Sequence, residues 1–184
     1  MTRILPIDEL NVLKNKYEFR GTGTPITDFE LDDIIDDLLD ILFLSIANGV
    51  ISINDTFGAD YVPSAEKIES VLYKRIDGKT WEDRVRDWYE NGGTSADIVR
   101  IAETESHRVG NEIAFEAAKE VGARFKTWLT MLDDRVRDTH EFLESVSVAI
   151  DDDFYTWDGD HAPFPGAFMN ADNNIGCRCE IQYS

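Results

Sequence analysis

Three side chains in the C-terminal part of the sequence, His140, Cys177 and Cys179, are of the types that bind zinc. The cysteines are one residue apart, and the segment 177–183 alternates between apolar and polar residues as a strand does. Successive side chains of a strand point to opposite faces, so both thiols are expected on the same face. Two thiolates on one face can chelate a metal ion together. The sequence therefore predicts either no cofactor or a zinc ion bound by this trio.

A four-coordinate zinc site needs one more ligand, and His107, His161 or an aspartate can supply it. A single Cys-x-Cys pair is equally compatible with two small core residues on the buried face of a final strand, where free cysteine is common. In that case His140 is a hydrogen-bonded histidine of the core or its boundary. A cysteine nucleophile with His140 as its base is a third option, which no other feature of the sequence singles out.

A second group, Asp133, Arg135, Arg137 and His140, is expected to form a structural polar network. Asp133 lies where a strand pattern ends, so it can cap the helix that follows and accept two hydrogen bonds from Arg137. A histidine beside carboxylates can also act in acid–base catalysis. The sequence places no second catalytic group near it, so we expect a network that orients the corner and no catalytic residue.

The remaining clusters of charged residues are expected to have structural roles or to be exposed to solvent. Glu105 lies three residues before Arg108 on a predicted helix, which favours a surface ion pair or a polar contact between helices. The run 151–153, with Asp158 and Asp160, lacks the spacing of a calcium loop and is expected to be an exposed acidic loop. The sequence also contains no Gly-rich phosphate loop, no Gly-x-Ser-x-Gly and no His-Glu-x-x-His motif.

The elements that must position these residues fall into two halves. Hydrophobic periodicity predicts a helical region first, after a loop at 21–25, with Thr27 or Asp28 as the first cap. Its predicted helices cover 28–47, ended by Asn48-Gly49, then 64–76, 81–90 and 95–121. The second half is predicted to contain strands at 124–132, 146–150 and 177–183, a short helix around His140 and a loop at 158–176. The predicted fold class is α+β, a helical N-terminal region followed by a small, largely antiparallel sheet with packed helices.

Composition excludes several classes of protein. The 184 residues carry a formal net charge of −19, spread over both halves, which opposes binding to nucleic acid and to anionic membranes. The 42% of hydrophobic residues is too high for a disordered acidic tail. No targeting segment or membrane span is apparent, and two closely spaced cysteines do not suit a secreted disulfide framework. We therefore expect a protein folded in a reducing compartment.

The order of several motifs resembles the phage Mu F-like head morphogenesis family, the minor head or minor capsid proteins of tailed phages and prophages. The matching motifs span about half the chain, from residue 96 to the C-terminus. They are Ile101-Ala-Glu-Thr-Glu-Ser-His-Arg108, Trp128 with Asp133, Arg135-Val-Arg-Asp-Thr-His140, Pro165-Gly166 and Cys177-Arg-Cys179. Each is weak alone, whereas their order and spacing together are considerably more specific.

The resemblance implies a virion structural protein with no catalytic site. It would comprise a helical, portal-contacting region at 1–92 and a head morphogenesis domain at 93–184. Its implied partners are the portal protein and the major capsid or scaffolding protein, with no direct contact to nucleic acid or membrane. It would be found inside the capsid, in the host cytoplasm during assembly, and could be ejected with the DNA. The competing hypotheses are a metal- or His-dependent toxin or nuclease domain and an acidic, DNA-mimicking regulator.

Overall fold

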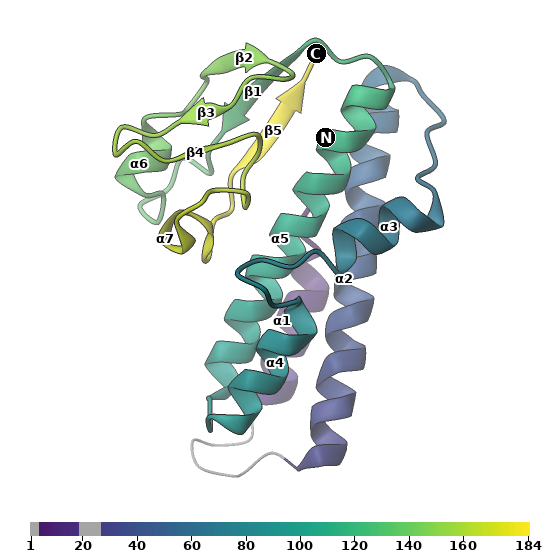
Figure 1. Cartoon of the computed structure of the whole chain (residues 1–184), viewed down its shortest axis with the longest axis vertical. Helices are drawn as coiled ribbons and strands as arrows, with labels where there is room; N and C mark the ends of the chain where they lie inside the picture. Colours follow the sequence, from purple (N-terminus) through teal and green to yellow (C-terminus); the bar gives the residue numbers. More distant parts are fainter. Residues whose placement is uncertain (1–3, 19–26) are drawn as a thin grey trace.

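Two long helices, α2 (Asp28–Phe57) and α5 (Ser95–Glu120), run side by side in the same direction and form the centre of the protein (Figure 1). The computed structural model describes residues 4–18 and 27–184. The predicted loop at 21–25 lies outside these residues. Three shorter helices pack against the long pair: α1 (Ile7–Glu18), α3 (Ala65–Leu72) and α4 (Trp81–Glu90). The predicted helical region is thus confirmed, and the structure adds α1, a helix that no pattern in the sequence predicts.

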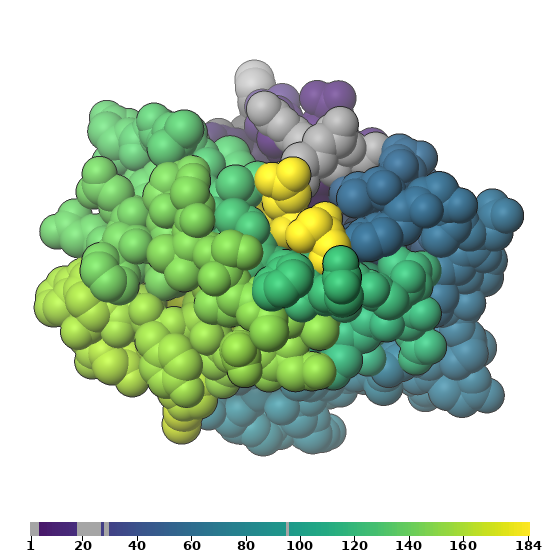
Figure 2. Space-filling view, turned by 90° about the horizontal axis from the view of Figure 1, so that it is seen from above, coloured from purple at the N-terminus to yellow at the C-terminus, as the bar shows by residue number. Residues whose placement is uncertain are grey.

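A small antiparallel sheet lies beside the C-terminal half of α5 (Figure 1). Its central strand β1 (Phe125–Leu129) pairs with β2 (Ser147–Ala149) on one side and β5 (Glu180–Tyr183) on the other. The remaining elements are a two-stranded ribbon of β3 (Phe154–Tyr155) and β4 (His161–Ala162), with the short helices α6 (Asp138–Glu141) and α7 (Ala171–Asn174). Seen from above, the C-terminal residues lie between the sheet region and the segment that leads from α2 to α3 (Figure 2). The predicted α+β class is confirmed.

The first turn of α2 forms where the sequence predicted it. The Thr27 side chain accepts a hydrogen bond from the Glu30 backbone N–H, and the Glu30 carboxylate accepts one from the Thr27 backbone N–H. This reciprocal capping box satisfies two backbone donors that the first helical turn leaves free.

The predicted end of α2 at Asn48-Gly49 is wrong, because the helix continues to Phe57. Gly49 is where α2 crosses α5: a Cβ atom there would lie 2.6 Å from the backbone oxygen of Gly110 and 2.7 Å from Cγ2 of Ile113. Gly110 faces the same crossing, and a Cβ atom on it would lie 3.2 Å from the Ser45 oxygen. The glycine at 49 therefore permits close packing of two helices and does not end one.

Two clusters of buried apolar residues hold the fold together. The first lies between α1, α2, α4 and α5, and includes Trp81 and Trp88. The second lies between the sheet and the C-terminal half of α5, around Trp128. Because α5 contributes to both, it connects the helical region to the sheet. The predicted division of the chain after residue 92 stays a prediction.

The buried face of β1 is unusual because it carries a lysine. Lys126 and Trp128 are fully buried, whereas Phe125, on the alternate face, is 49% exposed. The Lys126 Nζ lies 4.7 Å from the centre of the Phe115 ring and 5.4 Å from that of Phe154. It has no hydrogen-bond partner among the described residues. Burial lowers its pKa to about 8, against the opposing effect of the carboxylates at 151–153.

We expect Lys126→Met to change how stability depends on pH. Because the folded pKa of about 8 lies below the ordinary value of 10.5, the wild-type free energy of unfolding should rise as the pH increases between these values. From pH 7 to 9.5 the rise amounts to about 2 kcal/mol, a contribution that methionine lacks. Urea denaturation of both proteins across this range measures it. Parallel curves would show that Lys126 titrates normally.

None of the helices in the described residues combines the length and the apolar composition that a bilayer-spanning segment needs.

Candidate metal centre

The structure brings His140, Cys177 and Cys179 together at the edge of the second apolar cluster. His140 lies on α6, and the two cysteines lie in the extended segment that leads into β5. The His140 Nδ1 is 3.5 Å from the Sγ of Cys177 and 3.5 Å from the Sγ of Cys179. The three ligand atoms all lie within 4.8 Å of one another, and all three residues are buried. Among the described residues this is the only cluster of this kind.

The alternation predicted for segment 177–183 explains this arrangement. Cys177, Cys179, Ile181 and Tyr183 are all buried on one side, as expected. Regular pairing with β1 begins only at Glu180, so the cysteines precede the strand and do not lie within it. Their backbone is held separately, because the Cys177 N–H donates to the Asn174 oxygen and the Cys179 oxygen bonds with a histidine described below.

Aromatic rings enclose the imidazole on its inner side. The Trp128 ring meets His140 edge-on at 5.5 Å between ring centres, and the Phe168 ring stacks on it at 5.3 Å. The Nε2 atom of His140 has no hydrogen-bond partner among the described residues. On the outer side, a cavity of about 10 Å³ borders all three residues and is lined also by Arg135, Arg137 and Arg178. A volume of this order accommodates a single water molecule.

The two thiols differ in acidity. Burial raises the pKa of Cys177, but its hydrogen bond with Cys179 and the charges of Arg137 and Arg178 outweigh that effect and lower it overall. The pKa of Cys179 is raised, because the neighbouring Cys177 thiolate and burial both oppose a second negative charge. The two pKa shifts are therefore opposite in direction.

Among the residues that the structure describes, none of the predicted fourth ligands joins the trio. His161 pairs with Asp153 at 2.7 Å, outside the cluster. His107 is fully buried on α5, and its Nε2 lies 2.6 Å from the Cys179 backbone oxygen. Burial lowers the pKa of His107 to about 4, so the ring is neutral at pH 7. Because a carbonyl oxygen only accepts, the proton lies on Nε2. His107 thus positions the cysteine segment through its backbone.

The predicted network around Asp133 is wrong in its partners. Asp133 accepts two hydrogen bonds from Arg178, at 2.7 and 2.8 Å, and none from Arg137. The Arg178 guanidinium lowers the pKa of Asp133 to about 2. Arg135 does contact Asp133, through its backbone N–H at 3.2 Å. Arg178 lies between the two buried cysteines in an extended segment, and its side chain reaches Asp133.

The other two members of that predicted network also have different roles. Arg137 precedes α6 as its N-cap residue, so Asp133 does not cap the helix. The Arg137 side chain instead donates to the backbone oxygen of Ile175, in the loop before the cysteines. His140 faces the thiols and not Asp133. These contacts tie α6 and the cysteine segment together on both sides of the trio.

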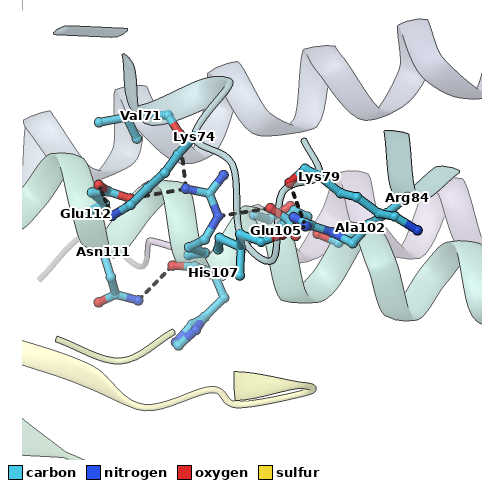
Figure 3. A network of polar contacts seen from close by, with 12 residues as sticks. Val71, Lys74, Lys79, Arg84, Ala102, Glu105, His107, Asn111 and Glu112 are labelled. Atoms are coloured by element: carbon cyan, nitrogen blue, oxygen red, sulfur yellow. Dashed lines mark hydrogen bonds and ion pairs between the residues drawn. The ribbon is translucent and has the colours of Figure 1, made fainter. Parts of the chain in front are cut away.

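Figure 3 shows a buried ionic network on α5, where the sequence predicts a surface ion pair or a polar contact between helices. Glu105 and Arg108 are 4% and 3% exposed, so the predicted surface ion pair is wrong. Arg108 donates to Glu105 at 2.9 Å, to Glu112 at 3.1 Å and to the Val71 backbone oxygen at 3.0 Å. Arg84 of α4 donates to Glu105 as well, which confirms the alternative of a contact between helices.

The acidic run at 151–153 forms no metal cluster among the described residues. Asp151 pairs with Lys119 at 2.7 Å, and Asp153 pairs with His161. Asp160 accepts hydrogen bonds from the backbone N–H groups of Met169 and Asn170 and from the Asn173 side chain. These aspartates therefore have structural partners.

Motifs that are distant in the sequence meet on one face of α5. His107 bonds with Cys179, and the Gly176 N–H donates to Thr104 at 3.3 Å. Gly166 has φ +91 and packs so closely that a Cβ atom on it would lie 3.1 Å from the Arg108 Cα. The Thr104–Arg108 segment is thus the platform on which the C-terminal loop and the cysteine segment pack.

Comparison with known proteins agrees with this grouping of motifs. A model of the family described as "Phage Mu protein F like protein" matches residues 66–182. A protein of Enterococcus faecalis (strain ATCC 700802 / V583) named NAD(+)--arginine ADP-ribosyltransferase EFV is 34% identical over 116 residues. That alignment covers 60% of this chain and 23% of the Enterococcus protein. No solved structure gives a significant match.

The matched range includes α5, the sheet and all the motifs that carried the resemblance in the sequence. It covers well over half of the chain. This protein therefore belongs to the phage Mu protein F like family and is a phage head-related protein.

Proposed function

We propose that this protein is a minor head, or minor capsid, protein of a phage or prophage, and that it acts in head morphogenesis bound to the portal inside the capsid. The family match over residues 66–182 is the observation that carries the proposal. In this proposal the protein is made in the host cytoplasm, enters the virion during assembly and can leave with the DNA. The major capsid or scaffolding protein is a further proposed partner.

The charge of the chain supports docking on protein surfaces and not on packaged DNA. A formal net charge of −19 repels the phosphate backbone, since nucleic-acid binding depends largely on lysine and arginine displacing counterions. The acidic side chains of α2 add to this effect on the helical side of the molecule. A protein repelled by DNA within a filled capsid would stay free to contact its protein partners.

The exposed apolar side of α2 is the surface we propose for the portal contact. Phe43, Leu44 and Ile51 are 45%, 40% and 46% exposed within little more than two turns of this helix. Ala47 lies between them and is also exposed. Exposed apolar side chains grouped on one element often mark protein interaction sites. The helical region therefore offers an apolar contact surface, although its tryptophans Trp81 and Trp88 are buried.

We expect this chain to co-purify with the portal protein of the same genome when the two are co-expressed. The double variant Phe43→Ser, Ile51→Ser should weaken that association by at least about 10-fold, since both side chains would bury apolar area in the contact. Size-exclusion chromatography and affinity capture measure it. Val62→Ser, at a side chain that is 83% exposed outside α2, is the matched control and should bind normally.

Mass spectrometry of purified virions tests the wider proposal. The protein should be present in mature particles and in proheads. Its absence from both would refute a role as a virion component, whatever the outcome of portal binding.

The activity named for the Enterococcus protein stays a property of that protein. The aligned segment makes up 23% of that protein, so the match does not identify which part carries its activity. The hypothesis of a toxin or nuclease domain gains no specific support from the described residues.

A further inference from the structure

We propose that His140, Cys177 and Cys179 bind one zinc ion, with a solvent molecule as the fourth ligand. Three buried side chains of zinc-ligand type converge here from two segments of the chain. Cys177 and Cys179 lie 37 and 39 residues after His140 in the sequence. This proposal is independent of the proposed function in the virion, because it concerns the chemistry of the trio alone.

Both sulfur–nitrogen distances in the trio match those of a tetrahedral zinc site. With Zn–S bonds of about 2.3 Å and a Zn–N bond of about 2.0–2.1 Å, a tetrahedral angle separates sulfur from nitrogen by about 3.6 Å. The His140 Nδ1 lies 3.5 Å from each of the two sulfur atoms. The imidazole nitrogen is therefore placed so that it can share one ion with either thiolate.

The surroundings hold the ligands in this arrangement. The Cys179 backbone is bonded to His107, the Cys177 backbone to Asn174, and the loop just before them to Arg137. Trp128 and Phe168 fix the plane of the imidazole. Ligands that the protein already orders cost less conformational entropy on binding.

The charge of the complex suits a buried position. Zn²⁺ with two thiolates and one neutral imidazole has no net charge, so the site places no uncompensated charge beside the aromatic rings. The fourth position faces the cavity of about 10 Å³, which holds about one water molecule. The arginines that line this cavity favour water or an anion there over a second cation.

A bound ion would connect α6 to the segment entering β5. Hydrogen bonds between Arg137 and Ile175, Thr139 and Asn173, and Arg178 and Asp133 already join these regions, and the ion would add direct bonds from His140 to both cysteines. The principal competing chemistry is a disulfide between the two cysteines, which would remove both thiolates and exclude the metal. The two states differ in mass and in thiol count, so they can be told apart.

The test is metal analysis of the full chain, expressed with zinc in the medium and purified without chelator. The wild type should retain about one zinc ion per chain, and Cys177→Ser and His140→Asn should each lose at least about nine-tenths of it. His161→Asn is the matched control, since it changes a histidine outside the cluster, and it should retain the full amount. Both thiols should react with a thiol reagent after denaturation.

Cobalt substitution keeps the test decisive if a variant fails to fold. The wild-type protein loaded with Co²⁺ should show a thiolate-to-cobalt charge-transfer band and the intense visible absorption of tetrahedral cobalt. Zinc should abolish both signals by competition. Two results would overturn the proposal. One is sub-stoichiometric zinc together with the absence of the cobalt bands. The other is a native protein in which the two cysteines are joined in a disulfide.

Discussion

Replacing Glu105 by alanine is expected to lower the free energy of unfolding by about 3–5 kcal/mol, the range found when one partner of a buried ion pair is removed. Glu105 accepts hydrogen bonds from both Arg108 and Arg84, and Arg108 is only 3% exposed. Without this carboxylate, Glu112 is the remaining acid bonded to Arg108. A buried guanidinium then stays partly uncompensated, and this is the main cost.

The loss should show in urea denaturation as a lower midpoint with an unchanged slope. Glu103→Ala on the same helix is the matched control, because Glu103 is exposed, and it should change stability by no more than about 0.5 kcal/mol. Glu105→Gln should fall between the two, since it keeps one acceptor and removes the charge. A Glu105→Ala protein as stable as the control would mean that solvent compensates Arg108, contrary to its burial.

Replacing Gly49 by leucine is expected to cost about 3 kcal/mol or more, at the upper end of the range for overpacking. A Cβ atom at this position would lie 2.6 Å from the backbone oxygen of Gly110, and a backbone atom cannot move aside as a side chain can. The two long helices would have to separate along their crossing. Both apolar clusters would be affected, because α5 contributes to each.

Gly49→Ala gives the sharper test of the mechanism. In an exposed helix interior, glycine to alanine stabilises by about 1 kcal/mol. Here we expect the opposite sign, a loss of about 1–2 kcal/mol, because the contact outweighs the gain in helix propensity. Thermal and urea denaturation measure it, and Asp40→Ala at an exposed position of the same helix should be neutral or stabilising. A stabilised Gly49→Ala protein would contradict the close crossing.

Local sequence patterns were sufficient to predict several helices of this protein and the orientation of its two cysteines. The helices near 81–90 and 95–121 begin and end within one residue of α4 and α5, and Thr27, one of the two predicted caps, is the N-cap of α2. These signals are reliable because caps and helical periodicity act between residues a few positions apart. The alternation in 177–183 likewise determined that the two thiols share a buried side with Ile181 and Tyr183.

The same local rules failed where the partner of a residue is distant in the sequence. Asn48-Gly49 has the composition of a helix end, but Gly110, 61 residues later, makes it a crossing point. Spacing predicts the nearby Arg137 as the hydrogen-bond donor to Asp133, whereas the donor is Arg178. The pairing of β5 with β1 brings the segment before β5 close to the segment after β1, where Asp133 lies. Spacing along the chain identifies which pairs can meet, and only the packing of elements decides which do.

By itself, the sequence therefore determined the α+β class, most of the helices, the family and the residue types of the candidate zinc site. Only the tertiary structure decided that His140 faces the two thiols, that His107 holds their backbone, and that Glu105 and Arg108 are buried. The physical reason is that capping, periodicity and alternation are set by neighbouring residues. Burial and the convergence of ligands depend on how α5 packs against the sheet, which no local pattern contains.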